Sequence, residues 1–434
     1  MALQKLRWLA LLAACALALT ACSNPAPSAA VGGGLDSQLA AIAGDPVLGM
    51  ASLSVLSIRG GRVAYERQFG MRSVNEGLSA TPQTMYRIAS VSKLVTTLGV
   101  MRLVEQGKLD LDADVNSYLG FSLRNPAYPE QPISLRMLLS HTSSLRDGGG
   151  YSWGAGTSLR EAMRDSQGKW DEANRPGVYF AYSNLNFGVV GTVMEAVAGE
   201  RFDRLMQRLV LDPLGLRGGF NPSAMPREQW RNIATLYRKR PPDGGPWLAS
   251  GQWSAQVDDY SVRAPASLAA IDSYKPGTNG TLFSPTGGLR MSAADLGKIM
   301  LMMIDRSAVN GKAFLAPASI KTMTTPQWRY QPGRPNGDTH HGLFTQWGLG
   351  VQQFESRKGR GSSMVEGGGF DAAGHLGEAY GLLSVFAFDA VRRNGMIVLI
   401  GGTASDPAAT PGKYSALTRQ EEVVLTALYR SVAP

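Results

Sequence analysis

Cysteine is almost absent from this sequence of 434 residues, which has only Cys15 and Cys22, both near the N-terminus. A chain without cysteine after residue 22 has no internal disulfide framework, so a hydrophobic core must stabilise its folded state. Apolar residues make up 44% of the chain and charged residues 18%. This composition supports a sizeable core and excludes a broadly disordered protein.

Long runs of basic residues are also missing, although the formal net charge is +9. Scattered charge is typical of a solvated surface, so we expect no nucleic-acid partner. Histidine is scarce, with four in the chain, and the pair at His340 and His341 offers no set of metal ligands with sensible spacing. The sequence has no phosphate-binding loop and no dinucleotide-binding glycine pattern, so we expect no metal and no cofactor.

The first residues, MALQKLRWLALLAACALALTAC, begin with a short basic segment and continue as an apolar run. This run is too short and too rich in alanine for a membrane span and is typical of a secretory signal peptide. It ends in Leu-Thr-Ala-Cys, which resembles the processing box of bacterial lipoproteins; ordinary cleavage nearby or an uncleaved anchor are the alternatives. The resemblance implies that residues 1–21 are removed and that Cys22 is lipidated.

A lipidated Cys22 implies an exported protein that is attached to a membrane through an N-terminal lipid. By lipoprotein sorting patterns, Ser23 after the cysteine suggests the outer membrane, facing the periplasm, in a Gram-negative cell. Residues 22–40 contain SNPAPSAAVGGG at 23–34, a composition that is typical of a flexible tether. We therefore expect a signal peptide over 1–21, a tether over 22–40 and one folded unit over 41–434.

Two alternating segments predict β-hairpins, one near each end of the folded unit. The first turns at Gly60-Gly61 and the second is expected to turn at Asn394-Gly395. Strands at both ends, with helices between them, predict an α/β (α+β) fold with an antiparallel sheet built from both chain ends. The middle would form a mostly helical subdomain over roughly 105–285. The expected helices are Leu94–Gln106, Leu135–Leu139, Asn186–Ala198, Phe202–Val210, Ala293–Met303 and Gln420–Leu428.

Ser90 and Lys93 form an S-x-x-K pattern within RIASVSK, at the start of a predicted helix. Side chains three residues apart share one helix face and adjacent ones diverge, so Ser90 rather than Ser92 can share a proton with the lysine. A serine hydroxyl becomes a nucleophile when a base takes its proton, and burial shifts a lysine toward its neutral form. The second copy of the pattern, Ser166 to Lys169, contains a glycine and is a poor helix start.

The segment TMYRIASVSKLVTTLGVMRLVEQGKLDLDADV resembles the serine β-lactamase and penicillin-binding-protein superfamily, particularly its class C-like branch. That branch also contains D,D-peptidases, family VIII esterases and D-aminopeptidases. The family signature continues with Y-x-N and then with K-T-G or H-x-G. Here Y-x-N stands at Tyr182 to Asn184, and H-x-G stands at His375 to Gly377. Matches extend over residues 49–402, and the fold implied is the β-lactamase/transpeptidase fold.

The resemblance assigns catalytic roles to the first two motifs. Ser90 would attack a carbonyl carbon, while Lys93 and Tyr182 would move protons, with Lys93 stabilising the phenolate of Tyr182. Asn184 would bind the substrate and orient Lys93. The alternative for Tyr182 is a buried tyrosine whose hydroxyl is satisfied within the core.

The third motif would form the substrate-binding edge. His375 would face the cleft as a hydrogen-bond donor or a pH-dependent cation, and the alternative is a structural histidine. Gly377 would let the substrate lie against the strand, and the N–H groups of Ser90 and Glu378 would form the oxyanion hole. The carboxylate of Glu378 would disfavour anionic substrates if it pointed into the cleft. His141, in ISLRMLLSHTSSL, would be structural.

The motifs together predict a serine hydrolase that acts on ester or amide bonds through an acyl-enzyme. The resemblance implies a carboxylesterase, a D,D-peptidase or a β-lactamase, with a small-molecule ester, a D-amino-acid peptide or a β-lactam as substrate. In the family, histidine in the third motif is commoner among peptidases and esterases than among β-lactamases proper. The alternative is a non-hydrolytic envelope lipoprotein that binds penicillin or peptidoglycan.

Overall fold

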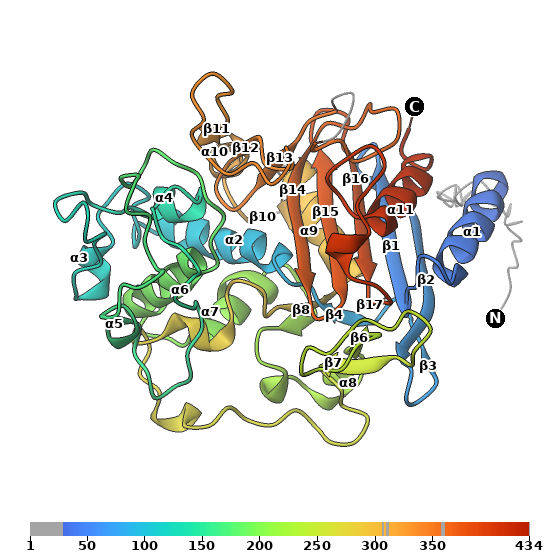
Figure 1. Ribbon diagram of the computed structural model, residues 1–434, viewed down its shortest axis with the longest axis horizontal. Coiled ribbons are helices and arrows are strands. Elements are labelled where there is room, and N and C mark those ends of the chain that lie inside the picture. The colour runs from blue at the N-terminus through green and yellow to red at the C-terminus, as the bar shows by residue number, and fades with distance from the viewer. Residues whose placement is uncertain (1–28, 306–307, 310–311, 357–360, 434) are drawn as a thin grey trace, which may run out of the picture.

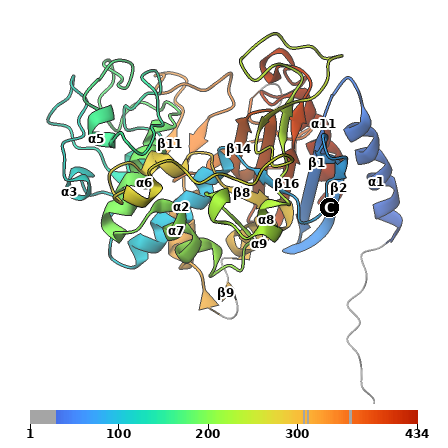
Figure 2. The same ribbon diagram turned by 90° about the horizontal axis from the view of Figure 1, so that it is seen from below.

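The computed structural model describes residues 29–305, 308–309, 312–356 and 361–433. The expected signal peptide and Cys22 lie outside these residues. The described chain forms a half built around a large sheet and a half made mostly of helices, and α2 (Val91–Glu105) extends from the first into the second (Figures 1 and 2). The motif residues come from both halves, so the site forms where the halves meet.

The large sheet is antiparallel and has nine strands in the described part of the chain. Its order is β11-β12-β13-β14-β15-β16-β1-β2-β3. The first strand of the chain therefore pairs with a strand near its end, as the sequence predicts. The bounds are β11 Trp328–Arg329, β12 Gln346–Trp347, β13 Gln352–Phe354, β14 Ala372–Ala379, β15 Leu382–Asp389, β16 Asn394–Ile400, β1 Ser52–Arg59, β2 Arg62–Ser73 and β3 Leu78–Ser79.

Alternation along the central strands separates two hydrophobic layers. In β1, Leu53 and Val55 point to the face covered by α1 (Ala29–Gly44) and α11 (Arg419–Tyr429). Leu56 and Ile58 point to the opposite face, which is covered by α9 (Ala293–Asp305) and continues into the helical half. Since side chains of a strand alternate between faces, one apolar strand supports both layers. Figure 1 shows α11 in front of the sheet and α9 behind it.

The helical half is assembled from short helices around one long buried helix, α6 (Leu185–Ala198). The remaining helices are α3 Asn116–Leu119, α4 Leu135–Leu139, α5 Leu159–Ala162, α7 Phe202–Met206, α8 Arg227–Trp230 and α10 Pro317–Thr324. The predicted helix over Phe202–Val210 divides into α7 and a π-helix over Gln207–Leu211. Small sheets are formed by β4 Met85–Arg87, β5 Gly218–Gly219, β6 Leu236–Arg238, β7 Ser254–Val257, β8 Arg290–Ser292, β9 Ala308–Val309, β10 Lys312–Ala313 and β17 Gly402–Thr403.

The expected tether over 22–40 is wrong for its described part, because α1 already begins at Ala29. Leu35 and Leu39 are four residues apart, lie on one helix face and are buried against the sheet. Asp36 accepts a hydrogen bond of 2.5 Å from the hydroxyl of Tyr65 in β2. The glycine-rich start of this segment gives no sign of a helix in the sequence. The helix is amphipathic, and packing of its apolar face against the sheet stabilises it in the folded chain.

The turn expected at Asn394-Gly395 is also wrong. Both residues belong to β16, where they pair with Asp389 and Phe388 of β15. The chain turns over residues 390–393 instead, and Arg393 takes the left-handed backbone conformation, with φ 58°. Asn394 is buried, and its side chain accepts a bond from the Gly60 amide and donates one to a carbonyl near the C-terminus, so it links segments rather than forming the turn.

Candidate active site

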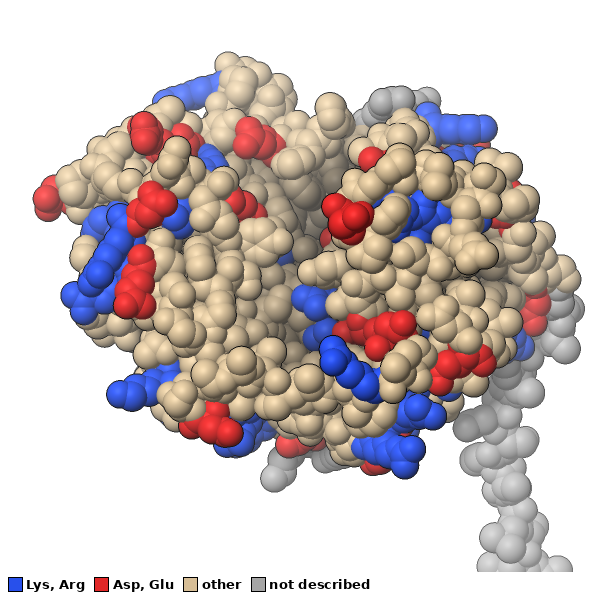
Figure 3. Space-filling model, turned by 60° about the horizontal axis from the view of Figure 1, so that its bottom comes forward, with Lys and Arg blue, Asp and Glu red and all other residues tan. Residues whose placement is uncertain are grey.

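A cleft of about 780 Å³ lies where the N-terminus of α2 meets β14. Strand β13 pairs only with Ala372–Gly374 of β14, so in the described structure the rest of that edge, from His375 to Ala379, has no strand beside it. The surface is hollowed between the two halves, and acidic and basic side chains are interspersed on this face (Figure 3). The motif residues that line the cleft are Ser90, Tyr182, Asn184, His375, Gly377 and Glu378.

Ser90 is the residue directly before α2, and its side chain makes no capping bond to the helix. Its hydroxyl is therefore free for chemistry at a helix N-terminus, where the helix dipole favours developing negative charge. The preceding residue, Ala89, has φ 46°, a strained conformation of the kind that gathers at functional sites. Ser92 points elsewhere, since its buried hydroxyl accepts a bond from the Leu289 amide. The helical argument for Ser90 over Ser92 is confirmed.

Lys93 is fully buried, and its ammonium nitrogen has three oxygen partners. These are Ser90 Oγ at 2.9 Å, Asn184 Oδ1 at 2.7 Å and the Thr286 carbonyl at 2.9 Å. Burial lowers the pKa of Lys93 to about 7, while the negative charge of Asp147 opposes that shift. The amine can therefore be neutral under ordinary conditions.

The partners of Lys93 decide which way its lone pair points. The Asn184 side-chain oxygen and the Thr286 carbonyl can only accept hydrogen bonds, so they take two N–H groups. When Lys93 is neutral, its lone pair is left for the hydroxyl of Ser90. This arrangement makes Lys93 a base that is already aligned with the nucleophile.

Tyr182 lies beside the same amine, with its ring centre 5.0 Å from Lys93 Nζ. Burial raises the pKa of Tyr182 above its ordinary value, and a hydrogen bond with Ser90 opposes this only in part. Its ring stacks on His141 at 4.5 Å, and His141 is itself buried, as expected for a structural residue. The expected phenolate is therefore disfavoured, and Tyr182 is a neutral proton donor.

Asp147 is a residue of the site that the sequence motifs do not indicate. Its carboxylate accepts bonds from Ser183 Oγ at 2.8 Å and from the backbone amides of Asn184 and Leu185, both at 2.9 Å. It also accepts a bond of 2.9 Å from Asn184 Nδ2. The last bond fixes the orientation of the amide, so that Oδ1 of Asn184 faces Lys93.

His375 lies on β14 with 2% of its surface exposed. Burial, with Lys93 adding to it, lowers the pKa of His375 to about 3, so of the roles that the sequence leaves open for His375, the cation is disfavoured at neutral pH. Its Nδ1 lies 2.6 Å from the Leu376 carbonyl, which can only accept, so Nδ1 carries the proton. Nε2 is then an acceptor without a partner in the described structure, and not the expected donor.

Gly377 lies directly against the backbone of the segment that leads into α2. A methyl group added to it would lie 2.9 Å from the Ser90 amide nitrogen and 2.8 Å from the Ile88 carbonyl oxygen. Only glycine allows this contact, which brings the Ser90 amide next to the strand that carries Glu378. The juxtaposition agrees with the oxyanion hole that the resemblance implies.

Further cleft residues come from segments that the sequence indicates only as scaffold. Trp347 comes from β12 and Gln352 from the start of β13, and α11 supplies Glu421. The Gly-Gly turn after Thr286 supplies the carbonyl that binds Lys93. No spacing pattern signals these residues, because each reaches the cleft through tertiary packing.

The alternative S-x-x-K pattern lies away from the cleft. Lys169 donates to the Asp165 carbonyl at 2.7 Å, and neither it nor Ser166 lines the cleft. Within the described ranges, His, Cys, Asp and Glu side chains form no group of three or more that could hold a metal ion.

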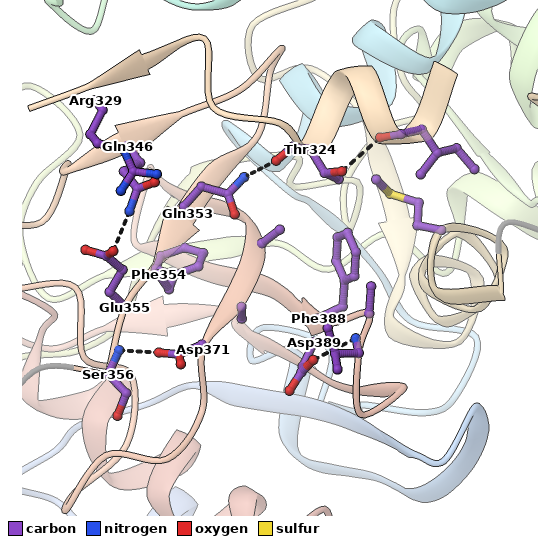
Figure 4. Close-up of a pocket in the computed structure, with 16 residues that line it drawn as sticks. Thr324, Arg329, Gln346, Gln353, Phe354, Glu355, Ser356, Asp371, Phe388 and Asp389 are labelled. Atoms are coloured by element: carbon purple, nitrogen blue, oxygen red, sulfur yellow. Dashed lines mark hydrogen bonds between the residues drawn. The ribbon is translucent and has the colours of Figure 1, made fainter. Parts of the chain in front are cut away.

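A second hollow, of about 680 Å³, lies at the other end of β13 and β14 (Figure 4). Its amide and carboxylate groups bond to one another or to nearby backbone: Gln346 with Glu355, Gln353 with the Thr324 carbonyl and Asp371 with the Ser356 amide. This hollow lacks the motif residues, so the chemistry belongs to the cleft at Ser90.

Residues 41–419 match the protein-family model described as Beta-lactamase. Among curated proteins, the chain is 27% identical over 171 residues to Protein flp of Staphylococcus aureus strain N315, covering 37% of this chain and 33% of that protein. It is 34% identical over 179 residues to Esterase EstB of Burkholderia gladioli, covering 37% of this chain and 44% of EstB. The matched segment thus spans about a third of the length of the first listed of these relatives, Protein flp.

Two solved structures superpose over most of both chains. D-amino acid amidase from Ochrobactrum anthropi SV3 has a TM-score of 0.64 at 18% identity, covering 92% of this chain and 99% of that one. A class C β-lactamase from Rhodobacter sphaeroides has a TM-score of 0.62 at 17% identity, covering 92% and 97%. At these identities the likeness establishes the fold.

Proposed function

The chain belongs to the β-lactamase family, and on that premise we propose that it is a serine hydrolase that cleaves ester or amide bonds through an acyl-enzyme on Ser90. The observation that carries this proposal is the buried amine of Lys93, which lies 2.9 Å from Ser90 Oγ and has a pKa of about 7. A base whose pKa lies near the working pH is suited to general base catalysis.

Acylation begins when neutral Lys93 takes the proton of Ser90 as Oγ bonds to the substrate carbonyl carbon. The carbonyl oxygen becomes an oxyanion, which the amides of Ser90 and Glu378 bind. The bond to the leaving group then breaks, and a proton from Tyr182 or Lys93 neutralises the departing atom. Tyr182 suits this step because it keeps its proton, and it regains one from the Lys93 ammonium.

Deacylation repeats these roles with water as the nucleophile. Neutral Lys93, or the Tyr182 hydroxyl acting together with it, accepts a proton from water as the water oxygen bonds to the acyl carbon. The bond from Ser90 Oγ then breaks, and Ser90 recovers a proton from the Lys93 ammonium. The bonds to Asn184 and Thr286 keep the amine aligned through both halves of the cycle.

Replacement of the nucleophile tests the proposal. Wild type and Ser90→Ala are compared on p-nitrophenyl acetate, nitrocefin and a D-Ala-D-Ala peptide, which represent the esterase, β-lactamase and D,D-peptidase types. We expect at least one substrate to be turned over by wild type and not by Ser90→Ala. Equal rates for the two proteins on every substrate would overturn the proposal.

Covalent labelling separates a hydrolase from a non-hydrolytic penicillin-binding protein. Wild type is treated with a fluorophosphonate and with fluorescent penicillin, and the adducts are located by mass spectrometry. A short-lived acyl adduct on Ser90 supports the hydrolase. A long-lived adduct without turnover of any substrate favours the binding protein instead.

We also propose that the protein is exported and held at a membrane by lipid on Cys22, on the basis of the lipoprotein processing box. Among the described residues, no helix has the length and apolar character needed to cross a membrane. Cys22→Ala is expected to release the protein into the soluble fraction, and unchanged membrane association would contradict lipidation at this residue.

A further inference from the structure

The wall of the cleft next to α11 carries two carboxylates that the proposed chemistry does not use. Glu378 follows Gly377 on β14, and Glu421 lies in the first turn of α11; both line the cleft that contains Ser90. Burial raises the pKa of Glu421 to about 7, and the negative charge of Glu378 contributes to the shift. The two side chains are therefore close enough to repel each other.

Glu421 is held in one position by its own helix. Its side chain is 5% exposed, and its Oε2 accepts bonds from the amide and the hydroxyl of Thr418 at 2.9 Å and 2.7 Å. Both bonds of this capping box end on the same oxygen, which leaves Oε1 for the cleft. Glu378 is exposed, and its side chain has no hydrogen bond or ion pair at contact distance within the described structure. Partial burial raises its pKa, and the positive charge of Arg238 opposes that shift.

A second part of the cleft wall also presents acceptors without partners. His375 Nε2 is buried and unpaired, and it lacks a proton because Nδ1 carries it. Gln352 is fully buried, and its Nε2 donates to the Leu343 carbonyl at 2.9 Å, which fixes the amide and leaves Oε1 unpaired. Buried polar atoms are normally satisfied, so these two acceptors indicate a ligand with hydrogen-bond donors, and the unpaired donor Trp347 Nε1 beside His375 indicates that the ligand also carries an acceptor.

Positive charge at the cleft is scarce by comparison. Among its described lining residues, three carboxylates (Asp147, Glu378 and Glu421) face one cationic side chain, Arg87. The Arg87 guanidinium already donates to the Gly287 carbonyl at 3.2 Å and lies over the ring of Tyr380. Arg238 is outside the lining residues, although its positive charge acts on Glu378. Among the described lining residues, negative side chains therefore outnumber positive ones.

We propose that the cleft selects substrates that carry an ammonium group, which binds beside Ser90 against Glu378 and Glu421, and that it disfavours substrates with a carboxylate at that position. This inference rests on the proposed hydrolase function and names its substrate class. An ammonium group provides the donors and the positive charge that the wall lacks, in a cleft where partial burial strengthens the attraction.

Matched substrates test the preference on both sides of the scissile bond. For the leaving group, 4-(aminomethyl)phenyl acetate, which carries a primary ammonium, is compared with 4-ethylphenyl acetate, in which a methyl group replaces it. For the acyl group, the p-nitrophenyl esters of β-alanine, butyric acid and succinic acid end in an ammonium, a methyl and a carboxylate. We expect kcat/KM to favour the cation over its uncharged isostere about tenfold in at least one series, with the carboxylate poorest.

In the double variant Glu378→Gln with Glu421→Gln, the ratio of kcat/KM for the cation to kcat/KM for its uncharged isostere is expected to fall close to one. The matched control is Glu228→Gln, which removes one exposed carboxylate of α8 outside the cleft and should keep the wild-type ratio. Ser90-dependent turnover with no preference for the cation in either series would overturn the inference and leave the hydrolase intact. A preference that survives in the double variant would also overturn it.

A binding measurement covers the case in which no substrate is turned over. The same esters are titrated into Ser90→Ala protein and followed by tryptophan fluorescence, since Trp347 lines the cleft. Tighter binding of the cation, lost in the double variant, supports the acidic wall even if the hydrolase proposal fails. Equal binding of cation and isostere overturns it.

Discussion

The central residue of this site is Lys93, a buried amine whose direct hydrogen-bond partners are all uncharged. Lys93 Nζ bonds to oxygens of Ser90, Asn184 and Thr286, and the negative charge of Asp147 reaches it across Asn184. A carboxylate in direct contact would keep the lysine charged, whereas one behind an amide adjusts its pKa while leaving the lone pair accessible. The proton affinity of the base is thus set by burial and tuned from a distance.

The pH dependence of the reaction should report this amine. We expect kcat/KM for an uncharged ester to rise with pH to a plateau, with a midpoint near 7, because only neutral Lys93 can take the proton of Ser90. His375, with its pKa near 3, should add no inflection between pH 5 and 9. Rates measured over that range check both statements.

Glu421 also has a pKa of about 7, so its contribution to the profile is removed with Glu421→Gln. The midpoint should remain near 7 in this variant if Lys93 controls it. A profile that becomes flat would assign the inflection to Glu421 instead.

Asp147→Asn should change the position of the profile as well as its height. Losing the negative charge lowers the pKa of Lys93 further, so the midpoint should move below that of wild type. The asparagine keeps one of the two oxygens, so two of the four donors lose their acceptor and face an NH2 group instead. This loosens Asn184, and we expect kcat to fall by about ten- to a hundredfold.

The matched control for this variant is Asp165→Asn, at an exposed carboxylate outside the cleft, which should leave both the midpoint and kcat unchanged. A loss of kcat in Asp147→Asn without any movement of the midpoint would contradict electrostatic coupling to Lys93 and leave only a structural role.

The residues of the site were predictable where they belong to short motifs with fixed order. Ser90, Lys93, Tyr182 and Asn184 meet as the resemblance implies. Asp147 and Thr286 were not predictable, because their bonds cross 37 and 193 positions of sequence and have no local periodicity. The sequence left the charge state of His375 open, since it depends on burial that the sequence does not display.

Among the elements, α1 differs most from its sequence expectation. Leu39 is fully buried between the sheet and α11, although it belongs to a segment expected to act as a tether. Leu39→Ala should lower the free energy of unfolding by about 2–5 kcal/mol, measured by urea denaturation. The exposed neighbour Ala40 provides the control, and Ala40→Gln should change the free energy of unfolding by less than about 0.5 kcal/mol.

If residues up to 40 formed only a tether, Leu39→Ala would change the free energy of unfolding as little as Ala40→Gln does. Activity per folded molecule should be the same in both variants, because α1 packs on the face of the sheet opposite α9 and away from the cleft.

Regular α-helices, both short and long, were predicted well, and irregular elements were not. The expected helix Leu135–Leu139 matches α4, and Ala293–Met303 lies within α9. The turn expected at Asn394-Gly395 failed because the pairing partners of these residues come from the register of β15, which overrides a local turn preference. The π-helix at Gln207–Leu211 likewise has no local signal.

For the whole molecule, the catalytic base carries a cost in stability that depends on pH. The unfolded chain holds a proton on Lys93 up to about pH 10.5, whereas the folded chain releases it near 7. Raising the pH between these values therefore stabilises the folded state. Relative to Lys93→Met, wild type should gain about 1.4 kcal/mol per pH unit in this window.

Denaturant unfolding of the two proteins at pH 7, 8 and 9 checks this difference, and all other titrating groups cancel in the comparison. A constant difference between wild type and Lys93→Met across the window would show that Lys93 is not neutral in the folded protein.

The architecture as a whole was predictable because hairpins at both ends with helices between them leave few ways to form one sheet. The strand order confirms this, with β1 beside β16. The cleft was less predictable, since its volume and its acidic wall arise from contacts between β14 and α11 that form only after both have folded.

The pairing of β1 with β16 also determines when the large sheet can form during protein synthesis. More than 300 residues separate the two strands, so a ribosome needs roughly 20–70 s to make the second after the first. During that time the apolar strand β1 has only β2 beside it and cannot complete its layer. The nascent chain therefore cannot complete the large sheet until the residues of β16 have been made.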